Sequence, residues 1–327
     1  MAHEINVVNG RASMAYFGET PWHGLGQKLE NPATAAEAIT AAGLDFEVGL
    51  HPLVTTSGLN APQRKAVVRP DTNQVLGVVG NSYVPIQNAE SFSLLDAIVA
   101  DGELQYHTAG ALGKGERVWM LAKLPGHIRV HNTEDITEKF LLLSNSHDGT
   151  SALRVFFTPI RVVCANTLAA AERRSGGQGV SILHRGDMLT KVQEAQAILG
   201  LANRFYDQVQ IGVNQLANYS PTRQELTTYF QLLYPDPLMG SKSRAENVRN
   251  ELFRLFEEGR GQDLQGIRHT TWAAFNAVTE YVDHHRPTRA RTAADRQSRR
   301  LESSWFGSGA KLKAHAWNLA LEMATAV

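Results

Sequence analysis

The spacing of apolar residues changes once along this chain, and that change constrains the fold more than any single motif. Apolar and polar residues mostly alternate over residues 46–164, which is typical of β-strands. After Asn166 the apolar residues recur at intervals of three and four, which is typical of helices. The pattern predicts an α+β protein with a curved antiparallel sheet of hairpins backed by helices, followed by a largely helical C-terminal half.

Two regions are expected from this change of periodicity. Residues 1–174 should form a core domain of antiparallel β-hairpins and helices. Residues 187–327 should form a helical region that contains a long amphipathic helix and a basic segment. Glycines at positions 176, 177, 179 and 186 mark the connection between the two regions.

Three strand pairs are expected in the first region, each joined by a turn of Gly, Asn, Asp or Pro. They lie at 64–69 and 75–80, at 104–112 and 118–124, and at 140–146 and 152–158. Residues 110–116 contain glycines and a lysine but lack the spacing of a phosphate-binding loop, which favours a hairpin turn. Helices are expected at 33–42, with Asn31 as N-cap and Gly43 as stop, and at 89–100.

The strongest helical pattern covers residues 187–216, where a long apolar stripe needs a partner. Packing within the chain and contact with a second subunit are both open interpretations of this stripe. A second helix should begin after Ser220-Pro221 and break at Tyr234-Pro235, because proline cannot continue the hydrogen-bond ladder. Further helices are expected at 244–258, 267–285 and 310–324.

The overall charge balance limits the classes of protein to which the chain can belong. The 32 Lys and Arg residues equal the 32 Asp and Glu residues, which argues against coating nucleic acid with the whole surface but permits a local basic patch. The single cysteine, Cys164, excludes an intrachain disulfide and a cysteine-based zinc cluster, which fits a reducing compartment.

The expected location is the cytoplasm, or the host cytoplasm if a phage encodes the chain. The N-terminus has neither a basic start nor an apolar core typical of a signal peptide, and no stretch approaches the roughly 20 apolar residues that span a bilayer. We expect no membrane contact, no cofactor and no metal. The adjacent His284 and His285 would point about 100° apart on a helix and so cannot chelate as a pair.

One polar turn suggests an enzyme as an alternative. His147 could act as a base near Asp148 or Asn145, with Cys164 as nucleophile, in a hydrolase or transferase. A hairpin turn explains the Asn, Asp and Gly residues here without any chemistry. No catalytic residue is therefore assigned.

The best functional signal is positive charge in the C-terminal third. Several arginines lie close together and are followed by Trp305, Phe306 and a Gly-Ser-Gly sequence that opens a helix. Arginines and free helix N–H groups suit phosphate, and an exposed aromatic residue could stack on an unpaired base. The alternative is a solvated basic loop with Trp305 and Phe306 packed in the core. The candidate nucleic-acid contacts in this segment are Arg286, Arg289, Arg291, Arg299, Arg300, Lys311 and Lys313.

A second, smaller basic set lies on the last strands of the sheet region. Arg154 and Arg161 are added to the candidate nucleic-acid contacts. An unbroken strand would place these two side chains on opposite faces, because seven positions separate them. Pro159 lies between them.

Several separated motifs, in order, resemble one family. They are Trp22-His23-Gly24-Leu25-Gly26, residues 145–149 with 158–168, and residues 272–283 with 306–310. Together they resemble the phage/plasmid-like proteins called domain of unknown function 932. That resemblance implies carriage by phages, plasmids or bacterial chromosomes, and a role in replication, recombination or conflict with the host. It implies no catalytic residues, because none is assigned for the family.

At the level of fold, the order of helix, hairpins and helix also resembles the core of single-strand annealing proteins of phage recombination. That resemblance implies a ring of subunits with DNA along a basic groove. The leading hypothesis is therefore a non-enzymatic, homo-oligomeric protein that binds single-stranded DNA during phage or plasmid recombination. A protein that binds a host factor through its helical half is the main alternative.

Overall fold

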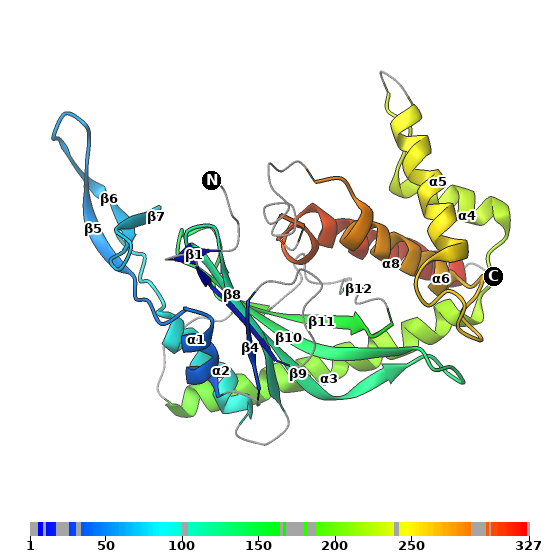
Figure 1. Ribbon diagram of the computed structural model, residues 1–327, viewed down its shortest axis with the longest axis horizontal. Helices are drawn as coiled ribbons and strands as arrows, with labels where there is room; N and C mark the ends of the chain where they lie inside the picture. The colour runs from blue at the N-terminus through cyan, green and yellow to red at the C-terminus, as the bar shows by residue number, and fades with distance from the viewer. Residues whose placement is uncertain are drawn as a thin grey trace.

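The computed structural model describes residues 6–8, 11–17, 26–30, 34–99, 104–163, 166–167, 180–181, 188–238, 242–288, 299–300 and 302–325. Its centre is a twisted sheet with helices against one face and a helical group at one end (Figure 1). The expected α+β class, with antiparallel hairpins first and mostly helices afterwards, is confirmed.

The main sheet has eight strands among the described residues, and seven of them follow the order β12-β11-β10-β9-β8-β3-β4. Neighbours are antiparallel except β3 and β4, which are parallel, and β13 pairs with β11. The strands are β3 (Met14–Phe17), β4 (Gln27–Leu29), β8 (Gln105–Leu112), β9 (Arg117–Arg129), β10 (Ile136–Ser146), β11 (Arg154–Arg161), β12 (Asn166–Thr167) and β13 (Val180–Ser181). The sequence predicted β8 to β11 as hairpin strands but missed β3 and β4.

A separate three-stranded sheet forms an arm that projects from the body (Figure 1). Its strands are β5 (Gly49–Val54), β6 (Asn60–Arg69) and β7 (Gln74–Gly80), and the expected turn joins β6 to β7. A Cβ at Gly77 would lie 2.5 Å from the Asp148 Cα, so the base of the arm packs directly on the β10–β11 turn. A two-stranded ribbon, β1 (Val7–Val8) with β2 (Arg11–Ala12), completes the strands.

Three helices lie on one side of the main sheet: α1 (Ala35–Ala41), α2 (Asn88–Val99) and α3 (Met188–Asn218). The expected N-cap of α1 was wrong. Thr34 caps this helix in a reciprocal capping box with Glu37. Asn31 lies outside the described residues, and the expected stop at Gly43 is confirmed by its φ of 63°.

Helix α3 is the predicted long amphipathic helix, and its apolar stripe is used within the chain. Ala202, Tyr206, Val209 and Val213 are buried in the same cluster as the sheet. The Tyr206 hydroxyl accepts a hydrogen bond from the Phe140 backbone N–H at 2.9 Å, which anchors α3 to strand β10. Of the two open interpretations of this stripe, packing within the chain is confirmed.

The remaining helices are α4 (Arg223–Leu233), α5 (Ser243–Glu258), α6 (Thr271–Glu280), a π-helix η1 (Tyr281–His285) and α8 (Ser308–Thr325). The expected break after α4 is confirmed, and a capping box of Thr222 with Glu225 begins that helix. The single helix expected over 267–285 was wrong in two respects, because α6 begins at Thr271 and ends in the π-helical turn.

The largest hydrophobic cluster runs from the helix-covered face of the sheet into α4, α5, α6 and α8. A smaller cluster lies on the opposite sheet face, where Trp305 and Phe306 pack on Trp119 and its neighbours. Both predicted regions contribute to the larger cluster, and their division at residues 174–187 stays a prediction. None of the helices among the described residues combines the length and the hydropathy needed to cross a membrane.

Candidate anion-binding site

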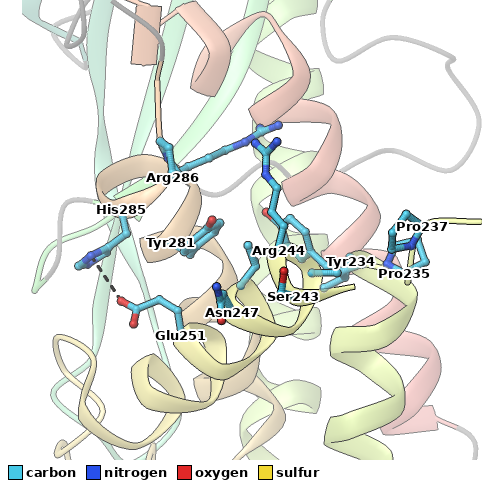
Figure 2. Close-up of a pocket in the computed structure, with 14 residues that line it drawn as sticks. Tyr234, Pro235, Pro237, Ser243, Arg244, Asn247, Glu251, Tyr281, His285 and Arg286 are labelled. Atoms are coloured by element: carbon cyan, nitrogen blue, oxygen red, sulfur yellow. Dashed lines mark ion pairs between the residues drawn. The ribbon is translucent and has the colours of Figure 1, made fainter. Parts of the chain in front are cut away.

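A pocket of about 900 Å³ lies where the end of α4, the start of α5 and the π-helix η1 meet (Figure 2). Tyr234, Pro235 and Pro237 line it from the segment that breaks α4. Arg244 and Asn247 line it from the first turns of α5, and Arg286 lies just after η1. The cavity is within the size range of small-ligand pockets, roughly 300–1,000 Å³.

Two arginine side chains bring positive charge to the lining of this pocket. Figure 2 shows the side chains of Arg244, in α5, and Arg286, just after η1, extending toward one another. Within the part of the chain that the structure describes, neither guanidinium forms an ion pair. The Arg286 side chain donates a hydrogen bond to the Ser308 hydroxyl at 3.3 Å. Two guanidinium groups without an ion pair among the described residues, in one concave site, attract an anion.

Two tyrosine hydroxyls add polar groups beside these charges. The Tyr234 hydroxyl is buried and has no hydrogen-bond partner among the described residues. Burial raises the pKa of Tyr281, the charges of Arg286 and Arg244 oppose that shift, and the charge of Glu251 adds to it. A ligand with hydrogen-bonding oxygens that reached Tyr234 would satisfy a buried group that is costly to leave unpaired.

The acidic groups near the pocket have partners of their own. Glu251 accepts two hydrogen bonds from Arg254, at 2.9 and 2.6 Å, which lower the pKa of the carboxyl. His285 lies 3.7 Å from Glu251, as Figure 2 shows, and 3.7 Å from Glu280. Glu251 is therefore the carboxylate of the pocket lining, and it shares Arg254 with Glu258, which lies 3.7 Å from that guanidinium.

The π-helix determines where Arg286 lies. The Arg286 backbone N–H donates to the Tyr281 carbonyl at 2.7 Å, which closes the wider i→i+5 turn. This turn brings Tyr281, His285 and Arg286 to the same pocket. Single π-helical turns are frequent at functional sites.

One predicted nucleic-acid contact, Arg161, is wrong. Its side chain is 0% exposed and pairs with Asp135, also 0% exposed, at 2.7 Å. It also donates to the carbonyls of Arg260 and Gly261, while the Trp272 indole N–H donates to Asp135 at 2.7 Å. This network joins β11 to the loop before α6, so Arg161 is a structural residue that cannot reach a phosphate.

The prediction for Lys313 is wrong for the same reason. Its side chain is 0% exposed and its ammonium group lies 2.7 Å from the Asp283 carboxylate, which also accepts from the Ser304 hydroxyl at 2.7 Å. Burial lowers the pKa of Lys313, and Asp283 opposes that shift. The pair connects α8 to η1 inside the helical group.

Arg154 lies on the sheet face opposite the main cluster, and Arg161 on the other, as the alternation of an unbroken strand requires. The Arg154 side chain is half-buried. Arg154 pairs across the strands with Ser144, which in turn pairs with Trp119. Trp305 packs edge-on against Trp119 at 5.0 Å between centroids, and Phe306 against Phe156 at 5.6 Å. Both aromatic rings therefore pack on the sheet, and of the two open interpretations the packing of Trp305 and Phe306 in the core is confirmed.

The other predicted contacts are divided between described and undescribed positions. Arg299 and Lys311 are exposed, Arg300 is half-buried, and the Arg300 guanidinium donates to the Arg286 carbonyl at 3.4 Å. Arg289 and Arg291 lie outside the described residues.

The helix N-terminus predicted to bind an anion is already occupied by the chain. Helix α8 does begin at Ser308, but the Gly309 N–H donates to the Ser303 hydroxyl at 3.1 Å. A Cβ at Gly309 would lie 2.8 Å from the Ser303 carbonyl oxygen, so close packing explains this glycine.

His147 is a buried hydrogen-bonding residue. It is 0% exposed, and its Nε2 lies 2.8 Å from the Asn88 Oδ1. Burial lowers the pKa of His147 to about 4, with Asp148 opposing the shift and Arg69 adding to it. The Asp148 carboxylate instead accepts from Ser146 and Thr150 within its own turn. Cys164 lies outside the described residues.

Arg244 is the pocket residue that the sequence did not single out. It was predicted only as the first residue of a helix, and the sequence carries no signal that α5 would bring it to Arg286. As for metals, the described residues contain no group of three or more His, Cys, Asp or Glu that could hold an ion.

Comparison with known proteins gives one match. A family model described as Domain of unknown function (DUF932) matches residues 75–305, which is more than half of the 327-residue chain. No curated protein and no solved structure matches. The matched range contains the Arg161 network and both pocket arginines. The chain therefore belongs to the DUF932 family, as its motifs predicted.

Proposed function

We propose that this protein binds the phosphate backbone of single-stranded DNA at the pocket beside η1. The observation that carries the proposal is the meeting of Arg244 and Arg286, two guanidinium groups without ion pairs among the described residues, in one cavity. Phosphate contacts from Lys and Arg supply most of the affinity of proteins that bind nucleic acid without reading its sequence. The original candidate set changes, because Arg161 and Lys313 are removed and Arg244 is added.

The chain beyond the pocket carries further cations. The Arg286 carbonyl accepts from Arg300, and the segment 302–306 that follows packs on the sheet face that carries Arg154. Arg299 and Lys311 add exposed positive charge along this part of the chain. We propose that these cations form a basic surface that contacts phosphates neighbouring the one held at the pocket.

Tyr234 favours an unpaired strand over a duplex. It is half-buried, lines the pocket and contacts the Tyr281 ring edge-on at 5.8 Å between centroids. An aromatic ring beside phosphate-binding arginines suits a base that is free to leave the stack. A role in phage or plasmid recombination and a homo-oligomeric state remain predictions from the sequence.

The test is the salt dependence of binding to a single-stranded oligonucleotide. For the unmodified protein, affinity should fall steeply as salt rises, because bound phosphates release counterions. In Arg244→Gln or Arg286→Gln, the slope of log K against log salt should lose about 0.7, and in the double variant about twice that. The measurement is fluorescence anisotropy at several salt concentrations.

A matched control is Arg64→Gln, which removes the same charge from an exposed site on the arm. It should leave the slope close to that of the unmodified protein. Absence of binding at low salt, or an unchanged slope in the double variant, would overturn the proposal.

A further inference from the structure

The charge of the pocket indicates which kind of phosphate it suits best. Glu251 is held by Arg254, and Asp236 is held by Arg249 at 2.7 Å and by Lys242 at 3.4 Å. Arg244 and Arg286 bring two positive charges to the cavity lining, and neither has a carboxylate partner among the described residues. An internal phosphodiester carries one negative charge, whereas a phosphomonoester carries close to two at neutral pH.

The number of N–H donors on the two arginines also favours a phosphomonoester. Each guanidinium presents a planar fork that pairs with two phosphate oxygens. A phosphodiester has two free oxygens, but a phosphomonoester has three strong acceptors, which can be shared by two forks that approach from different helices. Figure 2 shows the Arg244 and Arg286 side chains approaching in this way.

Groups away from the arginines could contact the rest of such a ligand. The buried Tyr234 hydroxyl has no partner among the described residues, and Asn247 lies one turn after Arg244 on the same helix. A sugar or base next to the phosphate offers donors and acceptors to both side chains. The cavity of about 900 Å³ is large enough for a nucleotide unit.

We propose that the pocket is a site for a phosphomonoester dianion, carried either by a free nucleotide or by the phosphorylated end of a DNA strand. For the strand end, this inference rests on the proposed function and assigns the pocket to the terminus, with internal phosphates on the basic surface beyond it. Arg244 and Arg286 hold the phosphate, and Tyr234 and Asn247 contact the attached nucleoside.

The experiment compares ligands that differ only in the monoester. Short single-stranded oligonucleotides of one sequence carry a 5′-phosphate, a 3′-phosphate or hydroxyls at both ends. In separate arms, a deoxynucleoside monophosphate is compared with its nucleoside. At moderate salt, one phosphorylated oligonucleotide should bind roughly tenfold to a hundredfold more tightly than the hydroxyl form, as expected for two charge-assisted contacts.

Variants assign the difference to the pocket. Arg244→Gln and Arg286→Gln should each remove most of the preference for the phosphorylated end, while Arg64→Gln on the arm should retain it. All three sites are on the surface or at an open pocket, and thermal unfolding verifies that each variant is folded.

The outcomes separate this inference from the proposed function. Equal binding of phosphorylated and hydroxyl oligonucleotides, with strong salt dependence, overturns the monoester site and leaves DNA binding in place. Binding of the nucleoside monophosphate without any oligonucleotide binding supports the site for a free nucleotide and overturns the DNA proposal. If no phosphorylated ligand binds, both fail.

Discussion

Arginine has two different roles in two neighbouring parts of this molecule. At the junction of sheet and helices, Arg161 is fully buried against Asp135, and the indole of Trp272 donates to the same carboxylate. At the pocket beside η1, Arg244 and Arg286 have no carboxylate partner among the described residues and lie at an open cavity. The side-chain chemistry is the same in both places. The difference is whether another element supplies a carboxylate.

This comparison has a direct energetic meaning. A buried charge is tolerated only when a partner and further hydrogen bonds replace its water, so a buried arginine is committed to the fold. An arginine at an open pocket keeps much of its hydration and contributes little to stability, which leaves it available for a ligand. Stability measurements can therefore distinguish the two roles.

The largest effect is expected at the buried junction. Arg161→Gln should lower the free energy of unfolding by about 3–5 kcal/mol, because it leaves the Asp135 carboxylate buried without its cation. Urea unfolding followed by circular dichroism measures the change, with Arg64→Gln on the arm as a control that should shift stability by less than about 0.5 kcal/mol. A loss at Arg161 as small as that of the control would mean that the junction does not depend on this pair.

The buried His147 allows a second comparison of a buried group with an exposed one, through the dependence of stability on pH. Because burial lowers the folded-state pKa of His147 to about 4 from its ordinary 6.5, the stability gained from the neutral ring is complete above pH 6.5 and is lost as pH falls toward 4. The size of this loss is about 3 kcal/mol. His147→Gln should therefore lose less stability than the unmodified protein between pH 7 and 4.

The measurement for His147 is the urea midpoint across that pH range, with the exposed His315→Gln as control. The control should follow the unmodified protein. If the urea midpoint of His147→Gln changed with pH in parallel with that of the unmodified protein, the His147 ring would not be the cause of this pH dependence.

The smallest effect is expected at the pocket. Arg244→Gln and Arg286→Gln should each change the free energy of unfolding by no more than about 0.5 kcal/mol, since neither guanidinium has an ion pair to lose among the described residues. The same urea titration measures it. If either variant lost more than about 1.5 kcal/mol of unfolding free energy, that arginine would have a structural role like that of Arg161.

Much of the fold was predictable because its signals are local. Asp148 and Gly149 specify a tight turn, and Gly149 has a φ of 77°, which glycine tolerates without strain. The stripe on α3 and the proline break after α4 were read in the same way. Strands β3 and β4 were missed because each is only a few residues long, and their pairing comes from distant parts of the chain.

The candidate site was less predictable, because it depends on which side chains meet. The arginine-rich segment was recognisable from composition, and one of its residues, Arg286, lines the pocket. Nothing near Arg161 or Lys313 in the sequence shows that Asp135 and Asp283 would neutralise them. Arg244 was missed for the opposite reason, since its partner in the pocket comes from another helix.

By itself, the sequence determined the class of fold, the hairpins, the long helix and the family, because hydrophobic periodicity, turn residues and ordered motifs act over short stretches of chain. Only the tertiary structure decided which arginines are buried in ion pairs and which face a cavity. The physical reason is that desolvation and pairing of a charge depend on groups brought close by folding, and no local pattern records those neighbours.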